Sequence, residues 1–113
     1  MTADESAALI AELADPGQEN VSSDLLETEL GRVAIRCGIP GGDVAAILAR
    51  FSLATPDRST FRQAARLPHP TLRSLDALHL AAALDLNADV VVTYDDRMIE
   101  ACRDLGLAVL SPR

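Results

Sequence analysis

Asp95 and Asp96 stand where carboxylates can do chemistry, directly after residues 89–94, which contain the apolar run Val90 to Val92. Such a run is typical of a strand buried on both faces, as in a parallel sheet. Ligands of open α/β sheets bind at the carboxyl ends of the strands, so both acids are expected at a functional edge. A structural role competes, because Thr93 to Asp96 fits a capping box with Thr93 as the N-cap. Capping accounts better for Asp96, which leaves Asp95 as the candidate for catalysis.

Asp76 is a second candidate, at the start of a nearly apolar helix predicted over residues 75–86. The helix dipole favours an acid in the first turn by roughly 0.3–1 kcal/mol, and Ser74 is the expected N-cap. His79 follows Asp76 by three residues and shares its face of the helix. A His in such a place more often binds a core neighbour than a metal, so we expect that role for His79.

Two glutamates of the helix predicted over residues 25–37 have to be separated. Asp24 to Glu27 fits a capping box, which gives Glu27 a structural role. Glu29 has no such role and borders the apolar stripe of its helix. The structural alternative for Glu29 is an ion pair with Arg32 on the helix surface, worth only a few tenths of a kcal/mol. Glu29 is therefore the third candidate.

Carboxylates gathered at one edge repel each other unless a cation lies between them. Hard oxygen ligands select hard cations, so Mg²⁺ or Mn²⁺ is the expected partner. Such an ion can activate water and stabilise an in-line attack on phosphate. The sequence contains no GxSxG, P-loop, HExxH or GxGxxG motif that would indicate another chemistry.

Composition limits what the chain can bind. Its 113 residues suit one domain, residues 1–113, and 49% are hydrophobic, enough for a packed core. Aromatic residues make up only 3%, which argues against a base-stacking platform. The net charge is −7 and every basic residue is Arg, so the acidic chain needs a bound cation to act on a polyanion.

The remaining composition indicates an ordinary cytoplasmic protein. Cys37 and Cys102 lack metal-knuckle spacing and are expected to be small buried hydrophobes in a reducing compartment. No basic segment followed by an apolar run opens the sequence, and no run approaches the ~20 apolar residues of a membrane span. We therefore expect neither secretion nor membrane insertion.

Periodicity and breakers predict alternating helices and short strands. Helices are expected at 3–14, 25–37, 43–51, 57–66, 75–86 and 96–105, and strands at 21–23, 52–55, 89–94 and 108–110. The last four elements read helix, strand, helix, strand. This alternation is typical of an α/β domain with a parallel sheet.

Three segments resemble one known family. Residues 72–81 (LRSLDALHLA) and 91–97 (VVTYDDR) resemble two motifs of PIN domains of the VapC ribonuclease type. Residues 22–32 (SSDLLETELGR) are similar to the helix that carries the family's glutamate. Residues 101–112 continue the match. The first two motifs at this spacing are fairly specific, and the matching segments are spread over residues 22–112.

The resemblance implies a three-layer α/β/α domain with a short parallel sheet. It implies that Glu29, Asp76 and Asp95 are metal ligands, with Thr93 and Asp96 in supporting positions. We expect the family's first strand and its terminal aspartate to be missing, because residues 5–23 align better with the family's second helix and second strand. Asp4 is the less favoured alternative for that aspartate, since it lies too close to Glu29 in the sequence. Either the natural start lies upstream, or the sheet lacks a central strand and has unpaired edges.

The resemblance implies a toxin of a type II toxin–antitoxin pair, an Mg²⁺-dependent endoribonuclease. Arg73 and Arg97 are weak candidates for contacts to RNA phosphates, against the alternative of solvated surface arginines. Implied partners are a second copy, giving a homodimer, and a VapB-like antitoxin. The alternative is a catalytically inactive PIN domain that binds an antitoxin or another partner. A third interpretation, Asp95 as a phosphate acceptor, is disfavoured because the chain has no Lys.

Overall fold

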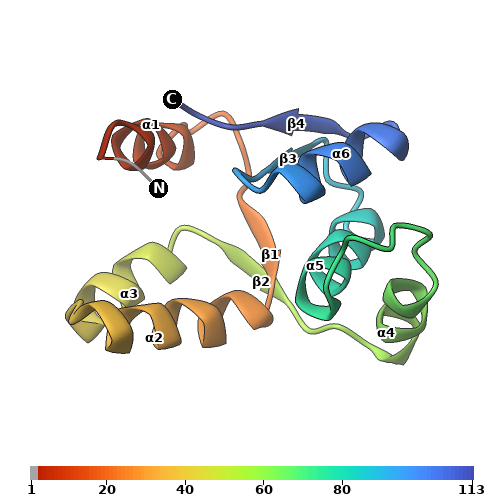
Figure 1. Ribbon diagram of the computed structural model, residues 1–113. Coiled ribbons are helices and arrows are strands. Elements are labelled where there is room, and N and C mark those ends of the chain that lie inside the picture. The colour runs from red at the N-terminus through yellow and green to blue at the C-terminus, as the bar shows by residue number, and fades with distance from the viewer. Residues whose placement is uncertain (1–2) are drawn as a thin grey trace.

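The computed structural model describes residues 3–113, apart from the side chains of residues 3 and 6. Short strands separate single helices or pairs of helices along this part of the chain (Figure 1). The helices are α1 Ala3–Leu13, α2 Leu25–Cys37, α3 Gly41–Leu48, α4 Arg58–Ala65, α5 Ser74–Asp85 and α6 Asp96–Asp104. The strands are β1 Val21–Ser23, β2 Ser52–Ala54, β3 Val90–Val92 and β4 Ala108–Leu110. Every predicted element is present, with ends shifted by a few residues.

The strands form two separate parallel pairs. Val21 to Ser23 of β1 align with Ser52 to Ala54 of β2, and Val90 to Val92 of β3 align with Ala108 to Leu110 of β4. The α/β class with parallel pairing is confirmed. The sheet is not continuous, however, because within residues 3–113 β1 and β3 do not pair with each other. The lack of a first family strand stays a prediction.

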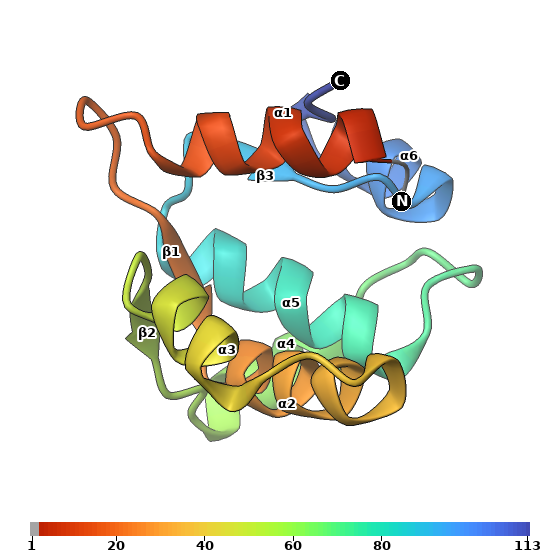
Figure 2. The same cartoon turned by 90° about the vertical axis from the view of Figure 1, so that its left-hand side faces the viewer.

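The prediction that residues 89–94 form a strand buried on both faces is wrong. The strand is short, and Val90 and Val92 are 47% and 40% exposed. Only the alternate face, with Val91 of β3 and Val109 of β4, packs against the core. Figure 2 shows α5 on one side of β3 in that view and α1 on the other.

The core lies where α5 meets α4 and α6. One cluster joins Leu80 of α5 to Met98, Ala101 and Cys102 of α6. A second cluster joins Ala64 of α4 to Ala77 and Ala81 of α5. Small alanines at these contacts let the helices approach closely.

The helix α5 is only partly the buried helix that its composition predicts. Its buried residues are Ala77, Leu80, Ala81 and Ala82, whereas Leu75 is 42% exposed. The apolar surface of the first turn is therefore open to solvent. This turn is the one that carries Asp76.

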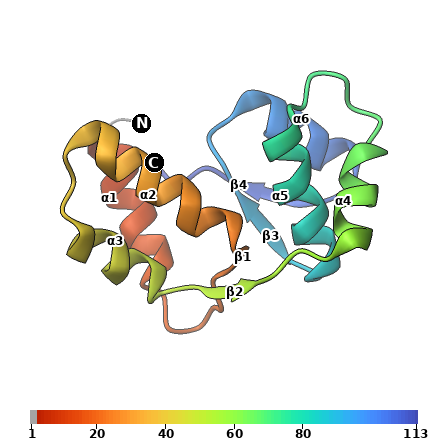
Figure 3. The ribbon, with the colours of Figure 1, turned by 90° about the horizontal axis from the view of Figure 1, so that it is seen from below.

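The start of α1 lies close to the C-terminal end of the chain (Figure 3). The Tyr94 hydroxyl donates to the carbonyl oxygens of Pro112 and Glu5, at 2.6 and 3.2 Å. Arg113 also forms an ion pair with Glu5 at 3.0 Å. Burial raises the pKa of Tyr94, so the hydroxyl stays protonated at neutral pH and remains a hydrogen-bond donor.

Both cysteines are free, and the prediction that both are buried is half wrong. Cys102 is fully buried in α6, but Cys37, at the end of α2, is exposed. None of the described helices is long and apolar enough to cross a bilayer.

Candidate active site

The N-terminus of α2 does not form the predicted capping box. Asp24 precedes the helix but makes no side-chain cap bond. Its Oδ2 instead accepts a hydrogen bond of 2.5 Å from the hydroxyl of Thr55, just beyond β2. The buried Ser23 takes over part of the capping, because its Oγ accepts from the N–H of Leu25 at 3.2 Å. These contacts fix the direction in which α2 leaves β1.

Glu29 points across the molecule to α5 and not along its own helix. Its Oε1 contacts Nε2 of His79, fifty residues later in the chain. The alternative pair of Glu29 with Arg32 is not among the ion pairs of the described residues. The two side chains are 38% and 24% exposed, so water can reach the pair. His79 is therefore bound to another side chain, as its sequence position indicates. Its partner, however, is Glu29, one of the candidate metal ligands.

Asp76 lies in the first turn of α5, one turn before His79. The N-cap position belongs to Arg73 and not to Ser74, and Arg73 makes no side-chain cap bond. Asp76 is half-buried and keeps the favourable position near the positive end of the helix dipole. The Glu29–His79 contact and Asp76 therefore occupy the same stretch of α5.

Asp95 is the N-cap of α6, which corrects the predicted assignment of that role to Thr93. Its Oδ1 accepts from the backbone N–H groups of Arg97 and Met98, at 2.8 and 3.4 Å. The bond from the Arg97 N–H is the main reason that the pKa of Asp95 lies below its usual range. The carboxylate is therefore ionised at neutral pH.

Thr93 supports Asp95 in another way. Its Oγ1 accepts from the backbone N–H of Asp95 at 3.2 Å, which fixes the turn between β3 and α6. Asp96 is exposed at the first position of α6 and makes no cap bond there. The predicted supporting position thus suits Thr93 better than Asp96.

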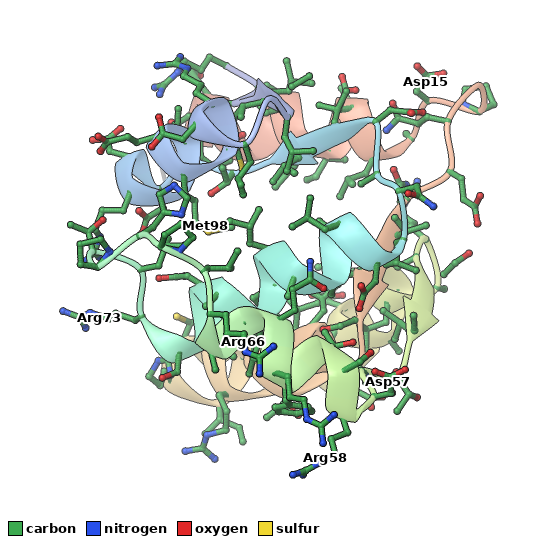
Figure 4. All side chains as sticks on the ribbon, turned by 90° about the vertical axis from the view of Figure 1, so that its right-hand side faces the viewer. Asp15, Asp57, Arg58, Arg66, Arg73 and Met98 are labelled. Carbon is green, nitrogen blue, oxygen red and sulfur yellow. The ribbon has the colours of Figure 1, made fainter. Side chains whose placement is uncertain are left out.

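The two candidate phosphate contacts differ in their freedom. Arg97 is exposed, and its Nε lies 3.7 Å from Oδ1 of Asp95. Arg73 is exposed at the start of α5 and extends away from the helix (Figure 4). Arg73 is therefore the more available of the two for an external anion.

The three candidate carboxylates do not form a closed cluster. Within the described residues, no three His, Cys, Asp or Glu side chains group in a way that could hold a metal ion. The structure brings Glu29 into contact with His79 of α5, one turn after Asp76, while Asp95 is engaged at the start of α6. The donors are hard oxygens, which suit Mg²⁺ or Mn²⁺ chemically, but their arrangement is open.

Comparison with known proteins identifies the class of the chain. The PIN domain family matches residues 2–104, and the chain belongs to that family.

Within the family the chain is of the VapC type. It is 45% identical to ribonuclease VapC35 of Mycobacterium tuberculosis over 101 residues, which cover 81% of this chain and 72% of that protein. It is 36% identical to ribonuclease VapC47 of the same species over 100 residues, covering 85% and 74%. No solved structure matches the chain.

Proposed function

We propose that this protein is an endoribonuclease of the VapC type that depends on a divalent cation, Mg²⁺ or Mn²⁺. The carrying observation is that folding brings Glu29 of α2 onto α5, where its carboxylate contacts His79 one turn after Asp76. Two relatives that match more than two thirds of their length are named as ribonucleases. Sequence similarity and the contact of Glu29 with the helix that carries Asp76 therefore support the same activity.

In this proposal Glu29, Asp76 and Asp95 hold the cation. When bound, the cation lowers the pKa of a water and offsets charge on the scissile phosphate. The chain's own residues position the ligands: His79 orients Glu29, and Thr93 fixes the backbone of Asp95. The depressed pKa of Asp95 keeps its carboxylate charged over the whole neutral range.

The proposed partners follow from the same relatives. A VapC-type ribonuclease takes RNA as its substrate and pairs with a VapB-like antitoxin. We extend both partners, the toxin role, a homodimer and a cytoplasmic location to this chain as parts of the proposal. An acidic protein of net charge −7 then relies on a local basic surface or on the cation to attract RNA.

One observation favours an alternative, a PIN domain that binds a partner without cleaving RNA. Asp95 Oδ1 is already shared between two backbone N–H groups and the Arg97 guanidinium. A cation would have to compete for this carboxylate or use its other oxygen. In the alternative, the acids serve the fold and an antitoxin-like partner, and no cleavage occurs.

The deciding experiment measures cleavage of random-sequence RNA in Mn²⁺, Mg²⁺ or EDTA. We expect cleavage with either ion and none in EDTA. Asp76→Asn should lower the rate by about a hundredfold or more, because a ligand matters at least as much as the groups that orient it. The matched control is Asp89→Asn, an exposed acid before β3, which should leave the rate unchanged.

A measurement of Mn²⁺ binding separates the ribonuclease from the partner-binding alternative. Binding is detected as a loss of the electron paramagnetic resonance signal of free Mn²⁺. Cation binding that Asp76→Asn weakens, together with cleavage, supports the nuclease. A folded wild-type protein that neither binds Mn²⁺ nor cleaves RNA would establish the partner-binding alternative.

A further inference from the structure

One segment of this acidic protein is strongly basic. Residues 58–73 contain four of the ten arginines and no Asp or Glu, although the chain as a whole carries −7. Three of the four, Arg58, Arg62 and Arg66, recur every fourth residue and so lie along one face of α4 and its C-terminal end. The charge is thus concentrated on one helix and the loop that follows it.

These arginines are free to bind an external anion. All are exposed, and the arginine ion pairs of the described residues involve Arg97 and Arg113 instead. Figure 4 shows Arg58 and Arg66 on α4, and Arg73 extending outward near the start of α5. Guanidinium groups bind phosphate oxygens in a bidentate manner, so the surface suits a chain of phosphates.

An apolar groove lies beside the basic face, between α4, the following loop and the start of α5. Its volume is about 370 Å³, and its lining includes Phe61, Leu67, Leu72 and Arg73. Phe61 is 51% exposed, unusual for a large apolar ring. The low aromatic content argues against an extended platform on which several bases stack. A single exposed ring can still stack on one base.

Helix α5 lies between the groove and the candidate active site. Ser74, Ala77 and Leu78 line the groove, whereas Asp76 and His79 lie on the other side of the helix. Residues on a helix follow one another by about 100°, which places the centres of the two sets roughly 180° apart. Arg73 stands at the N-terminal end of both faces.

We propose that the Arg58–Arg62–Arg66 face and the Phe61 groove together bind single-stranded RNA, with Arg73 of the groove lining as a further phosphate contact. The arginines contact successive phosphates, and one base stacks on Phe61. This proposal rests on the proposed ribonuclease function for the identity of the ligand. It assigns substrate binding to α4, a helix that carries none of the candidate catalytic residues.

The test measures the affinity of a fluorescein-labelled single-stranded RNA by anisotropy, in EDTA so that no cleavage interferes. The variant Arg58→Gln/Arg62→Gln/Arg66→Gln removes three charges from α4 and its end. The control variant Arg36→Gln/Arg50→Gln/Arg103→Gln removes three equally exposed charges elsewhere. Glutamine keeps the helix propensity of arginine, and circular dichroism checks that both variants fold.

We expect the α4 variant to weaken binding by about tenfold or more and the control by much less. Each phosphate contact contributes about 0.7 to the slope of log affinity against log salt for single strands. The slope should therefore fall by about 2 in the α4 variant and stay nearly unchanged in the control. Equal losses in the two variants would overturn the proposal, because they would reflect net charge alone.

Phe61 supplies a second readout that distinguishes RNA from an acidic peptide. Phe61→Leu keeps an apolar side chain but removes the ring, and should weaken RNA binding by about fivefold. Phe61→Trp should restore affinity, and since the chain has no other Trp, quenching of its fluorescence by RNA reports stacking directly. Unchanged RNA affinity of Phe61→Leu, with RNA displaced equally well by polyglutamate, would overturn the proposal in favour of an acidic polypeptide partner.

The two proposals fail separately. If RNA binds through α4 but no cation supports cleavage, the binding surface stands and the nuclease function fails. If cleavage occurs while the α4 and control variants share the same KM and affinity, the nuclease stands and the binding surface fails.

Discussion

The two halves of the chain are packed very differently. Both core clusters draw their buried residues from α4, α5 and α6, and Cys102 and Leu80 are fully buried there. In the described part of residues 4–54, only Ser23 and Ala34 are buried. Apolar side chains of α1 and α2 remain open instead, with Ile10 61% and Ile35 70% exposed.

The difference teaches where the candidate site gets its rigidity. Asp76 and Asp95 are carried by α5 and α6 in the packed half, whereas Glu29 is carried by α2 in the loose half. The halves are joined where α5 packs against β1, where Tyr94 and Arg113 contact Glu5, and at the Glu29–His79 contact. We therefore expect the position of Glu29 to be the least rigid part of the site.

The largest expected effect is a difference in thiol reactivity, since each half contains one cysteine. Cys37 is exposed, while burial raises the pKa of the Cys102 thiol and shields it from reagents. Ellman's reagent should modify Cys37 quickly and Cys102 roughly a thousandfold or more slowly, because Cys102 must wait for the core to open. In Cys37→Ser only the slow phase should remain. Equal rates at both thiols would show that the packed half opens as readily as the loose one.

Next in size is the effect of deleting core side chains. Leu80→Ala should lower the free energy of unfolding by about 2–5 kcal/mol, because it leaves a cavity at the contact of α5 and α6. Ile35→Ala, on the exposed face of α2, should change it by less than about 0.5 kcal/mol. Urea denaturation of the two variants measures both values. Similar losses would mean that the halves share their stability evenly.

The smallest effect separates the two roles of Asp95. Asp95→Ala removes the cap of α6 and should lower the free energy of unfolding by about 1 kcal/mol, whereas Asp95→Asn keeps a capping side chain and should cost little. Both should reduce cation binding, because both remove the carboxylate. Equal stability of the two variants would show that Asp95 contributes nothing as a cap.

The pH dependence gives an independent check of this cap. The pKa of Asp95 is lower in the folded than in the unfolded chain, so its contribution is complete above about pH 4. It is lost as the pH falls through the lowered pKa of the folded state. Acid titration of Asp95→Asn should therefore show a shallower loss of stability than the wild type.

Much of the fold could be predicted from local patterns. Apolar spacing located all helices and strands, because an amphipathic element shows its period in its own residues. The capping predictions were less successful: Asp95 and not Thr93 caps α6, and Ser23 and not Asp24 offers its side chain to α2. Several polar residues stand near each helix start, and the backbone path decides which of them faces the free N–H groups.

The sequence by itself determined the PIN family, the order of elements and the acids that are candidates for chemistry, since each depends on neighbouring residues or short motifs. Only the tertiary structure decided that Glu29 meets His79, that the strands form two separate pairs, and that an open groove lies between α4 and the start of α5. Those relations join residues far apart in the chain, and they depend on how the helices pack, which no local pattern specifies.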